Sequence, residues 1–258
     1  MSIGSITMIG AGRVATHLAL HLAERGTEIR QVYSRTMKSA EKLADKLGAM
    51  AVDRLVDLDH KSDLYIVAVV DDAIPGIVRQ FSPAGKIVVH TSGSVAMDAL
   101  QTASAHHGVF YPLQSFTHGR EVDFSEIPLC IEASDAATES NLLELAKMLS
   151  RDVRLIDSTQ RALIHVAAVF ANNFSNFLFL QGGEILEQAG VSFDILLPLI
   201  RETVQRLNQH HPRETQTGPS VRNDEKTMGK HLNLIAGDPS KKEIYLLLSK
   251  YIQKEFNA

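Results

Sequence analysis

The sequence is short of cysteine, has no tryptophan and contains no long apolar run. The single cysteine, Cys130, excludes an internal disulfide and any metal site built from several cysteines. The longest unbroken apolar run, Leu64 to Val70, is far shorter than the ~20 residues that span a bilayer. We therefore expect no membrane partner.

An excess of positive charge is also lacking. The formal net charge is −4 and no dense run of Lys and Arg occurs, which argues against nucleic-acid binding. His210 and His211 have no carboxylate or cysteine at ligand spacing, so we expect no metal site. The first residues show neither the basic region nor the apolar stretch of a secretory signal, and we expect a soluble, cytoplasmic protein.

The first half of the chain alternates β-rich runs with amphipathic helical stretches, which predicts a mostly parallel sheet with right-handed crossovers. The runs over 64–70 and 86–90 show no polar alternation, as in strands buried on both faces. The strands are expected at 5–9, 28–33, 64–70, 86–90, 109–111, 129–132 and 153–156. The helices are expected at 14–25, 37–47 (with Gly48 as C-cap) and 135–149.

The pattern changes after Asp157, beyond which no strand is predicted. Helices are expected over 159–189, from Ser192 to Leu207 with a kink at Pro198, over 225–235 and over 239–256. Asp238 and Pro239 form an N-cap followed by a proline at the first helical position. The fold class is thus α/β: a doubly wound, Rossmann-type domain over residues 1–157 and an all-helical domain over residues 158–258.

A glycine-rich turn follows the first strand and opens a helix. Gly10, Ala11, Gly12, Arg13, Val14 and Ala15 have the form G-x-G-x-x-A. The first glycine allows a tight turn, the second lets the backbone approach a pyrophosphate, and the small last residue lets helix and strand pack. Its place inside a strand–helix–strand unit favours dinucleotide binding over an ordinary structural turn.

The end of the second strand indicates which dinucleotide binds. An NAD site usually places a carboxylate there, whereas this chain has Ser34, Arg35 and Thr36. Arg35 offers a forked donor for a ribose 2′-phosphate, and the two neighbouring residues offer hydroxyls. We therefore predict NADP as cofactor, the alternative being a solvated loop arginine.

Further candidates follow the central strands, where ligands of such sheets bind. Val70 and Asp71 should border the cofactor, Ser92 should meet the substrate, and Tyr111 should take part in catalysis. Each has an alternative structural reading: Asp71 as a helix cap, Ser92 in a turn and Tyr111 as a core aromatic.

Two polar clusters stand out in the helical half. On a regular helix, His165, Asn172 and Asn176 share one face, and Asn173 lies beside them, among apolar neighbours. A buried polar face needs partners or a cleft, so we interpret His165, Asn172 and Asn173 as catalytic candidates. In the second cluster Arg222 and His231 are candidates for substrate binding. Structural histidines and a capped helix after a polar loop are the alternatives.

These residues resemble a bacterial family that combines an NADP-binding Rossmann-like domain with a C-terminal domain of unknown function, number 2520. The resemblance rests on the glycine turn, on His90 to Ser94, on the stretch from Arg161 to Asn173, and on a C-terminal cluster. That cluster comprises Thr217, Gly218, Pro219, Arg222, Asp224, Thr227 and His231. More distantly, the layout is similar to pyrroline-5-carboxylate reductase, prephenate dehydrogenase and the 3-hydroxyacid dehydrogenases.

The resemblance implies a helical second domain, similar to the C-terminal domain of 6-phosphogluconate dehydrogenase, that dimerises and completes the active site. It also implies departures. The hydroxyacid dehydrogenases use a lysine where His165 stands, and prephenate dehydrogenases have His-Pro where this chain has Tyr111-Pro112. The residue that handles the proton is therefore not carried over from either group.

The leading hypothesis is an NADP-dependent oxidoreductase acting on a small, polar, carboxylated substrate, with His165 handling the proton because histidine titrates near neutrality. Asn172 or Asn173 would orient the substrate and Arg222 would hold its anion. The alternatives are an NADP-binding sensor without catalysis and a reductase coupled to a deazaflavin. A homodimer through the helical domain is expected, since aromatic residues surround the helix at 159–189.

Overall fold

The computed structural model describes residues 3–117, 119–120 and 122–257. The chain forms two compact units, residues 1–169 and 170–258. The sheet and the first helix of the helical half, α5 (Ser158–Ala168), belong to the first unit. The compact unit thus extends beyond residue 157, where the sequence predicts that the helical half begins.

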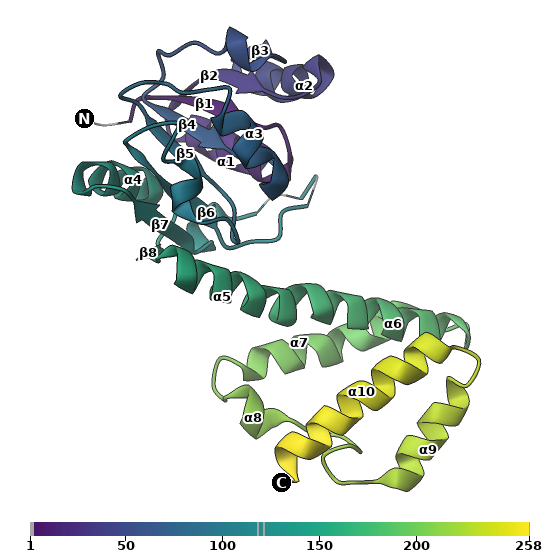
Figure 1. Ribbon diagram of the computed structural model, residues 1–258. Coiled ribbons are helices and arrows are strands. Elements are labelled where there is room, and N and C mark those ends of the chain that lie inside the picture. The colour runs from purple at the N-terminus through teal and green to yellow at the C-terminus, as the bar shows by residue number, and fades with distance from the viewer. Residues whose placement is uncertain (1–2, 118, 121, 258) are drawn as a thin grey trace. The chain divides into compact units, whose positions relative to one another are not determined.

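The first unit is built on an eight-stranded sheet of order β3-β2-β1-β4-β5-β6-β7-β8 (Figure 1). All neighbouring strands are parallel except β6 and β7, which are antiparallel. The strands are β1 (Ser5–Ile9), β2 (Glu28–Tyr33), β3 (Met50–Val52), β4 (Leu64–Val67), β5 (Ile87–His90), β6 (His107–Pro112), β7 (Leu129–Ala133) and β8 (Val153–Leu155). The order reverses at β1, whose neighbours are β2 and β4, so the crevice for a ligand lies beyond the carboxyl ends of β1 and β4.

Both faces of this sheet are covered. Ile6 and Met8 pack into one core cluster with α1 (Arg13–Glu24), α2 (Met37–Leu47) and α4 (Ala136–Leu149). Ile9 and its neighbours on the other face pack against α3 (Ile74–Val78) and short 3-10 turns. Alternate residues of β4 likewise enter different cores, Leu64 and Ile66 one and Tyr65 and Val67 the other, which explains why this strand appears in the sequence as an unbroken apolar run.

Most predicted elements of this unit are confirmed, with three differences, one of which is that the short helix α3 was not predicted. Gly48 ends α2 in the left-handed conformation, at φ 63°, as a glycine C-cap does. The short strand β3 has no counterpart among the predicted strands, because three residues are too few to show a pattern. The prediction that a strand runs to Val70 was wrong: β4 ends at Val67, and the chain then turns into a 3-10 helix at Asp71–Ala73.

The described residues of the second unit form helices joined by loops, with no strand among them. A π-helical segment (Val169–Phe174) leads into α6 (Ser175–Glu187), followed by α7 (Leu197–Arg206), α8 (Pro212–Thr215), α9 (Glu225–Leu234) and α10 (Pro239–Phe256). The predicted kink at Pro198 was wrong, since Pro198 lies in the first turn of α7, where its missing N–H costs no hydrogen bond. Asp238 caps α10 as predicted, accepting from the backbone N–H of Lys241.

Polar side chains tie the helices of this unit together. The buried ammonium of Lys241 donates to Glu184 on α6 at 2.7 Å and to Asp238 at 2.6 Å. The Ser220 and Ser249 hydroxyls form a hydrogen bond of 3.0 Å. These hydrogen bonds and ion pairs link separate segments of the second unit.

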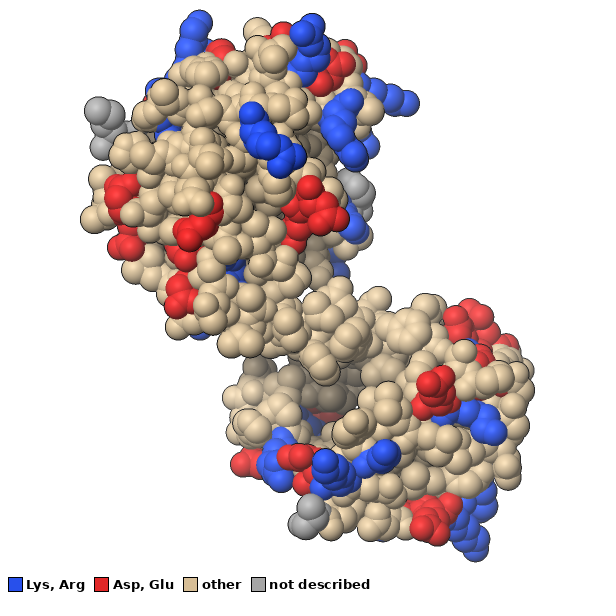
Figure 2. Space-filling view, viewed as in Figure 1, with Lys and Arg blue, Asp and Glu red and all other residues tan. Residues whose placement is uncertain are grey.

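The helix over Ser158–Glu187 is long and apolar enough to cross a membrane, by length and composition alone. Its most apolar window has a mean hydropathy of 1.5 and is not buried within a single chain. Side chains exposed along it include Phe170 at 66% and Phe174 at 50%. On the face drawn in Figure 2, the blue side chains of the first unit lie mostly toward its top and most of the red ones lie below them, whereas the two colours are mixed over the second unit.

Candidate active site

The turn between β1 and α1 has the geometry that a dinucleotide requires. Gly10 has φ 126°, and a Cβ there would lie 2.2 Å from the carbonyl oxygen of Ala68, so only glycine fits. Around Gly12, by contrast, a Cβ would meet no atom within 4 Å. Gly12 is the N-cap of α1, whose first turn carries no acidic residue. The helix N–H groups thus face open space suited to a pyrophosphate.

A cavity of about 1250 Å³ opens from this turn along the carboxyl edge of the sheet. Eleven of the predicted cofactor, substrate and catalytic residues line it: Gly10, Ala11, Gly12, Arg13, Val14, Ser34, Arg35, Val70, Asp71, Ser92 and Tyr111, and His165 adds a twelfth. All lining residues belong to the first unit. The β-strand order therefore gathers residues from six separate segments of the chain into one site.

The end of the cavity beside β2 carries two arginines rather than the single one predicted. The Ser34 N–H donates to the Val52 carbonyl at 3.1 Å, so the chain beyond β2 and the chain beyond β3 lie side by side. Arg35 follows β2, and Arg54 follows β3 together with the carboxylate of Asp53. Thr36 does not line the cavity, because it is the N-cap of α2, and its hydroxyl donates to Ser39. The two arginines fit the 2′-phosphate of NADP.

Arg54 and Asp53 were missed by sequence reasoning. The signal that identifies Arg35 is its place at the end of a recognisable strand, and β3 is too short to be recognised. Pairing of β3 with β2 is what brings Arg54 to the site.

A buried histidine, His90, holds the loop after β5 in place through hydrogen bonds. His90 accepts from the Ser92 N–H through Nδ1 and contacts the Ala96 carbonyl through Nε2 at 3.3 Å. Burial lowers the pKa of His90 to about 4, so its ring is neutral at physiological pH. The Ser92 hydroxyl in turn accepts from the N–H groups of Ser94 and Val95. Ser92 thus shapes this turn as well as lining the cavity.

Tyr111 and His165 meet at the wall of the cavity. The Tyr111 hydroxyl lies 3.1 Å from Nδ1 of His165, and the two rings are in edge-on contact. Burial raises the pKa of Tyr111 to about 12, so the phenol keeps its proton. It can donate to a neutral imidazole or accept from an imidazolium, and either hydrogen bond leaves Nε2 of His165 for a ligand. The structure thus joins two catalytic candidates that are 54 residues apart.

Gly93, in the His90–Ser94 stretch that the sequence places at the site, makes a contact that the sequence does not predict. A Cβ at this position would lie 2.5 Å from Nδ1 of His165, so the imidazole packs directly on the backbone of the loop. Beside it, the Ser94 hydroxyl donates to the Asp71 carboxylate, which joins the loops after β4 and β5. These contacts define the wall of the cavity around His165.

The other predicted residues belong to the second unit. Asn172 and Asn173 lie in the π-helical segment, where the regular helical spacing used to align them with His165 does not hold. His231 contacts the Tyr245 hydroxyl through Nδ1 at 2.9 Å, and Arg222 is exposed. Their roles in catalysis and substrate binding stay predictions.

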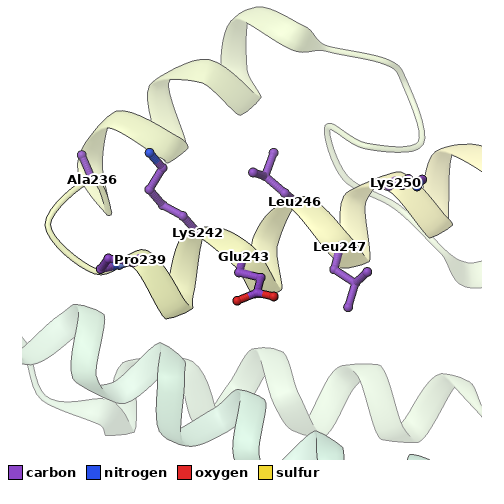
Figure 3. Close-up of a pocket in the computed structure, with 7 residues that line it drawn as sticks. All are labelled: Ala236, Pro239, Lys242, Glu243, Leu246, Leu247 and Lys250. Carbon is purple, nitrogen blue, oxygen red and sulfur yellow. The ribbon is translucent and has the colours of Figure 1, made fainter.

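A second hollow, of about 530 Å³, lies on α10 (Figure 3). Figure 3 shows Lys242 and Leu246 on one side of α10 and Glu243 and Leu247 on the other, and Lys250 also lines the hollow. No predicted site residue lines it. Among the described residues, no group of three or more His, Cys, Asp or Glu side chains could hold a metal ion. The chemistry thus concentrates in the larger cavity.

Comparisons with known proteins agree with this site. Residues 5–93 match the family model described as NADP oxidoreductase coenzyme F420-dependent, and residues 127–252 match the domain of unknown function 2520. A structure of a candidate NADP oxidoreductase from Bacteroides fragilis is 41% identical, with a TM-score of 0.90 and 98% of each chain covered. No protein of curated function matches the chain.

More distant structures share the fold. A reductive aminase from Aspergillus terreus, in complex with NADPH4, cyclohexanone and allyl amine, is 16% identical, with a TM-score of 0.73. The match covers 98% of this chain and 93% of the reductive aminase chain. An imine reductase from Streptomyces aurantiacus is 15% identical, with a TM-score of 0.72 and coverage of 97% and 93%.

The glycine turn, the arginines beside β2 and the cavity along the sheet define an NADP-dependent oxidoreductase, related in fold to imine reductases and reductive aminases. The chain belongs to the family in which an NADP-binding Rossmann-like domain is followed by the domain of unknown function 2520.

Proposed function

We propose that this protein reduces the carbonyl or imine carbon of a small, polar, carboxylated substrate with NADPH, or catalyses the reverse oxidation. The observation that carries the proposal is the contact of Tyr111 with His165 at the wall of the cavity that begins at the glycine turn. NADPH bound along this cavity supplies the hydride. The protein's own residues must then hold the substrate and move one proton.

His165 is the group that we assign to the proton. In the reducing direction the imidazolium donates from Nε2 to the substrate oxygen or nitrogen, while the substrate carbon gains the hydride. Nδ1–H of the ring then donates to the Tyr111 oxygen. Because the Tyr111 phenol stays protonated, it orients the ring and does not itself act as a base.

The remaining predicted residues complete the proposal. Asn172 and Asn173 orient the substrate, Arg222 and His231 hold its carboxylate, and the Ser92 hydroxyl contacts the reacting group. A forked guanidinium suits a carboxylate because it donates two parallel hydrogen bonds.

A substrate panel tests the proposal. Purified protein is mixed with NADPH and a series of keto acids, or with keto acids and amines that form imines, and oxidation is followed by absorbance. We expect steady turnover with at least one carboxylated compound, and turnover lowered by about 10²–10⁴-fold in a His165→Ala preparation. Tight NADPH binding without turnover of any compound would favour the sensor hypothesis instead.

We also propose that a second copy of this chain covers the helix over Ser158–Glu187. Between Arg161 and Glu184 this helix carries no Asp, Glu, Lys or Arg, and phenylalanines are exposed along it. An uncharged, aromatic surface of this kind resembles the interface of an obligate homodimer. The same face on two copies is self-complementary about a two-fold axis.

Light scattering should give the mass of a dimer at micromolar concentration. Phe170→Glu combined with Phe174→Glu buries two charges in the proposed interface and should shift the mass toward that of a monomer. Met148→Glu, on the exposed side of α4, is the matched control and should leave the dimer intact. A monomeric wild-type protein, or one that floats with lipid vesicles, would refute the dimer.

A further inference from the structure

We propose that Arg161 and Glu132 are positioning residues that hold His165 against Tyr111. The inference rests on the proposed role of His165, but it concerns residues that do not themselves line the cavity. It is carried by a buried polar network in the first unit.

The network centres on a guanidinium that is almost fully buried. The Arg161 side chain is 1% exposed, and that of Glu132 is 16% exposed. Nη1 of Arg161 donates to the Glu132 carboxylate, and Nη2 donates to the Val95 carbonyl at 2.6 Å and to the Ser158 hydroxyl at 3.1 Å. Removing two charges from water is costly, and apolar residues would fill the same volume at least as stably. A buried pair of this kind is better explained by the geometry that it imposes.

That geometry joins three elements. Glu132 lies on β7 and accepts from both the N–H and the hydroxyl of Ser158, at 3.0 and 2.8 Å, at the start of α5. The Ser158 hydroxyl in turn accepts from the Met97 N–H at 3.0 Å. The first turn of α5 is therefore fixed both to the sheet and to the loop after β5.

The contacts that Arg161 and Ser158 make with the segment after β5 determine the surroundings of His165. Arg161 and His165 are four residues apart on α5, so they lie one turn apart on the same side of the helix. Gly93, whose backbone packs on the imidazole, lies two residues before Val95. Holding Val95 with Arg161 therefore fixes the backbone against His165 and leaves the ring little room to turn away from Tyr111.

Charge balance is the second contribution. The charged or titratable groups that act on the Tyr111 hydroxyl are Cys130, Arg161 and Asp71, and those that act on the nearby loop histidine His90 are Arg161, Asp71 and Glu132. Burial has the larger effect on the pKa of Tyr111, which it raises, while the positive charge of Arg161 lowers it. Glu132 is the ion-pair partner of Arg161, so a change in either residue alters the surroundings of this charge as well as the position of the loop.

Nitrogen NMR of the His165 ring tests the inference in Glu132→Gln, Arg161→Met and Arg161→Lys. In the wild type we expect separate Nδ1 and Nε2 signals of one hydrogen-bonded tautomer. In Glu132→Gln and Arg161→Met these signals should converge as the ring loses its fixed orientation, with Arg161→Lys intermediate. With a turned-over substrate, kcat should fall about 100-fold in Arg161→Met, as for a misplacement of about 1 Å, with NADPH affinity unchanged.

Lys241→Met is the matched control, since it removes a cation of similar burial, 8% exposed, from between two carboxylates of the second unit. It should lower thermal stability and leave the His165 signals unchanged. Should Arg161→Met fail to fold, Glu132→Gln decides, because its amide keeps the shape of the carboxylate. Unchanged His165 signals in Glu132→Gln and Arg161→Lys would overturn the inference. The NMR result is independent of turnover, so failure of the proposed function would appear separately, as an inactive wild type with ordered His165 signals.

Discussion

Arg35→Ala should remove most of the preference of this protein for NADPH over NADH. Arg35 lines the cavity beyond β2, the strand whose end meets the adenosine ribose in this fold. A hydrogen bond to a charged group contributes about 1.5–3 kcal/mol, which corresponds to roughly 10- to 150-fold in affinity. The loss should therefore fall within that range for NADPH and be small for NADH, as measured by calorimetry.

Two further variants sharpen this experiment. Arg54→Ala should also weaken NADPH binding, by less than Arg35→Ala, since Arg54 is 72% exposed and lies near the Asp57 carboxylate. Arg25→Ala, at the end of α1 and outside the cavity, is the control and should bind both cofactors like the wild type. Because these arginines are exposed, the preference should weaken as salt is added. Equal affinities of the wild type for the two cofactors would contradict the assignment.

The fold is largely predictable because its signals are local. The strand Leu64–Val67, for example, is buried on both faces and therefore appears as an unbroken apolar run. Caps are equally visible, as at Gly48 and Asp238. What cannot be predicted lacks a local signal: β3 is three residues long, and the π-helical segment Val169–Phe174 follows the same apolar pattern as an α-helix.

The residues of the site also fall into two groups, those with a local signal in the sequence and those without one. The glycine turn, Arg35 and Tyr111 are identifiable because each has a fixed place relative to one strand. Arg54 and Gly93 are not, since their importance depends on contacts with distant segments: β2 for Arg54 and the His165 ring for Gly93. The pair of Arg161 and Glu132, from α5 and β7, likewise requires the folded chain to be seen.

His165→Ala should lower kcat by about 10²–10⁴-fold once a substrate is in hand, the range for loss of a general acid or base. NADPH affinity should change little, because the residues that suit the cofactor's phosphates lie around the glycine turn and beyond β2. His165→Asn should be almost as slow, since an amide keeps some hydrogen bonding but cannot titrate. Steady-state kinetics and calorimetry on the same preparations separate turnover from binding.

The variant Tyr111→Phe distinguishes two roles for the phenol: orienting His165, which is then the acid, or donating the proton itself. If the phenol only orients the ring through its 3.1 Å hydrogen bond to Nδ1, losing it should cost about 1 kcal/mol, or roughly fivefold in kcat. If the phenol donated the proton, Tyr111→Phe would be as slow as His165→Ala, and the order of the two roles would be reversed. His106→Ala, a histidine of the same unit that contacts Asp135 outside the cavity, should retain full turnover. Near-wild-type turnover of both His165 variants would remove His165 from the mechanism, because proton transfer requires a group within hydrogen-bond reach that can titrate.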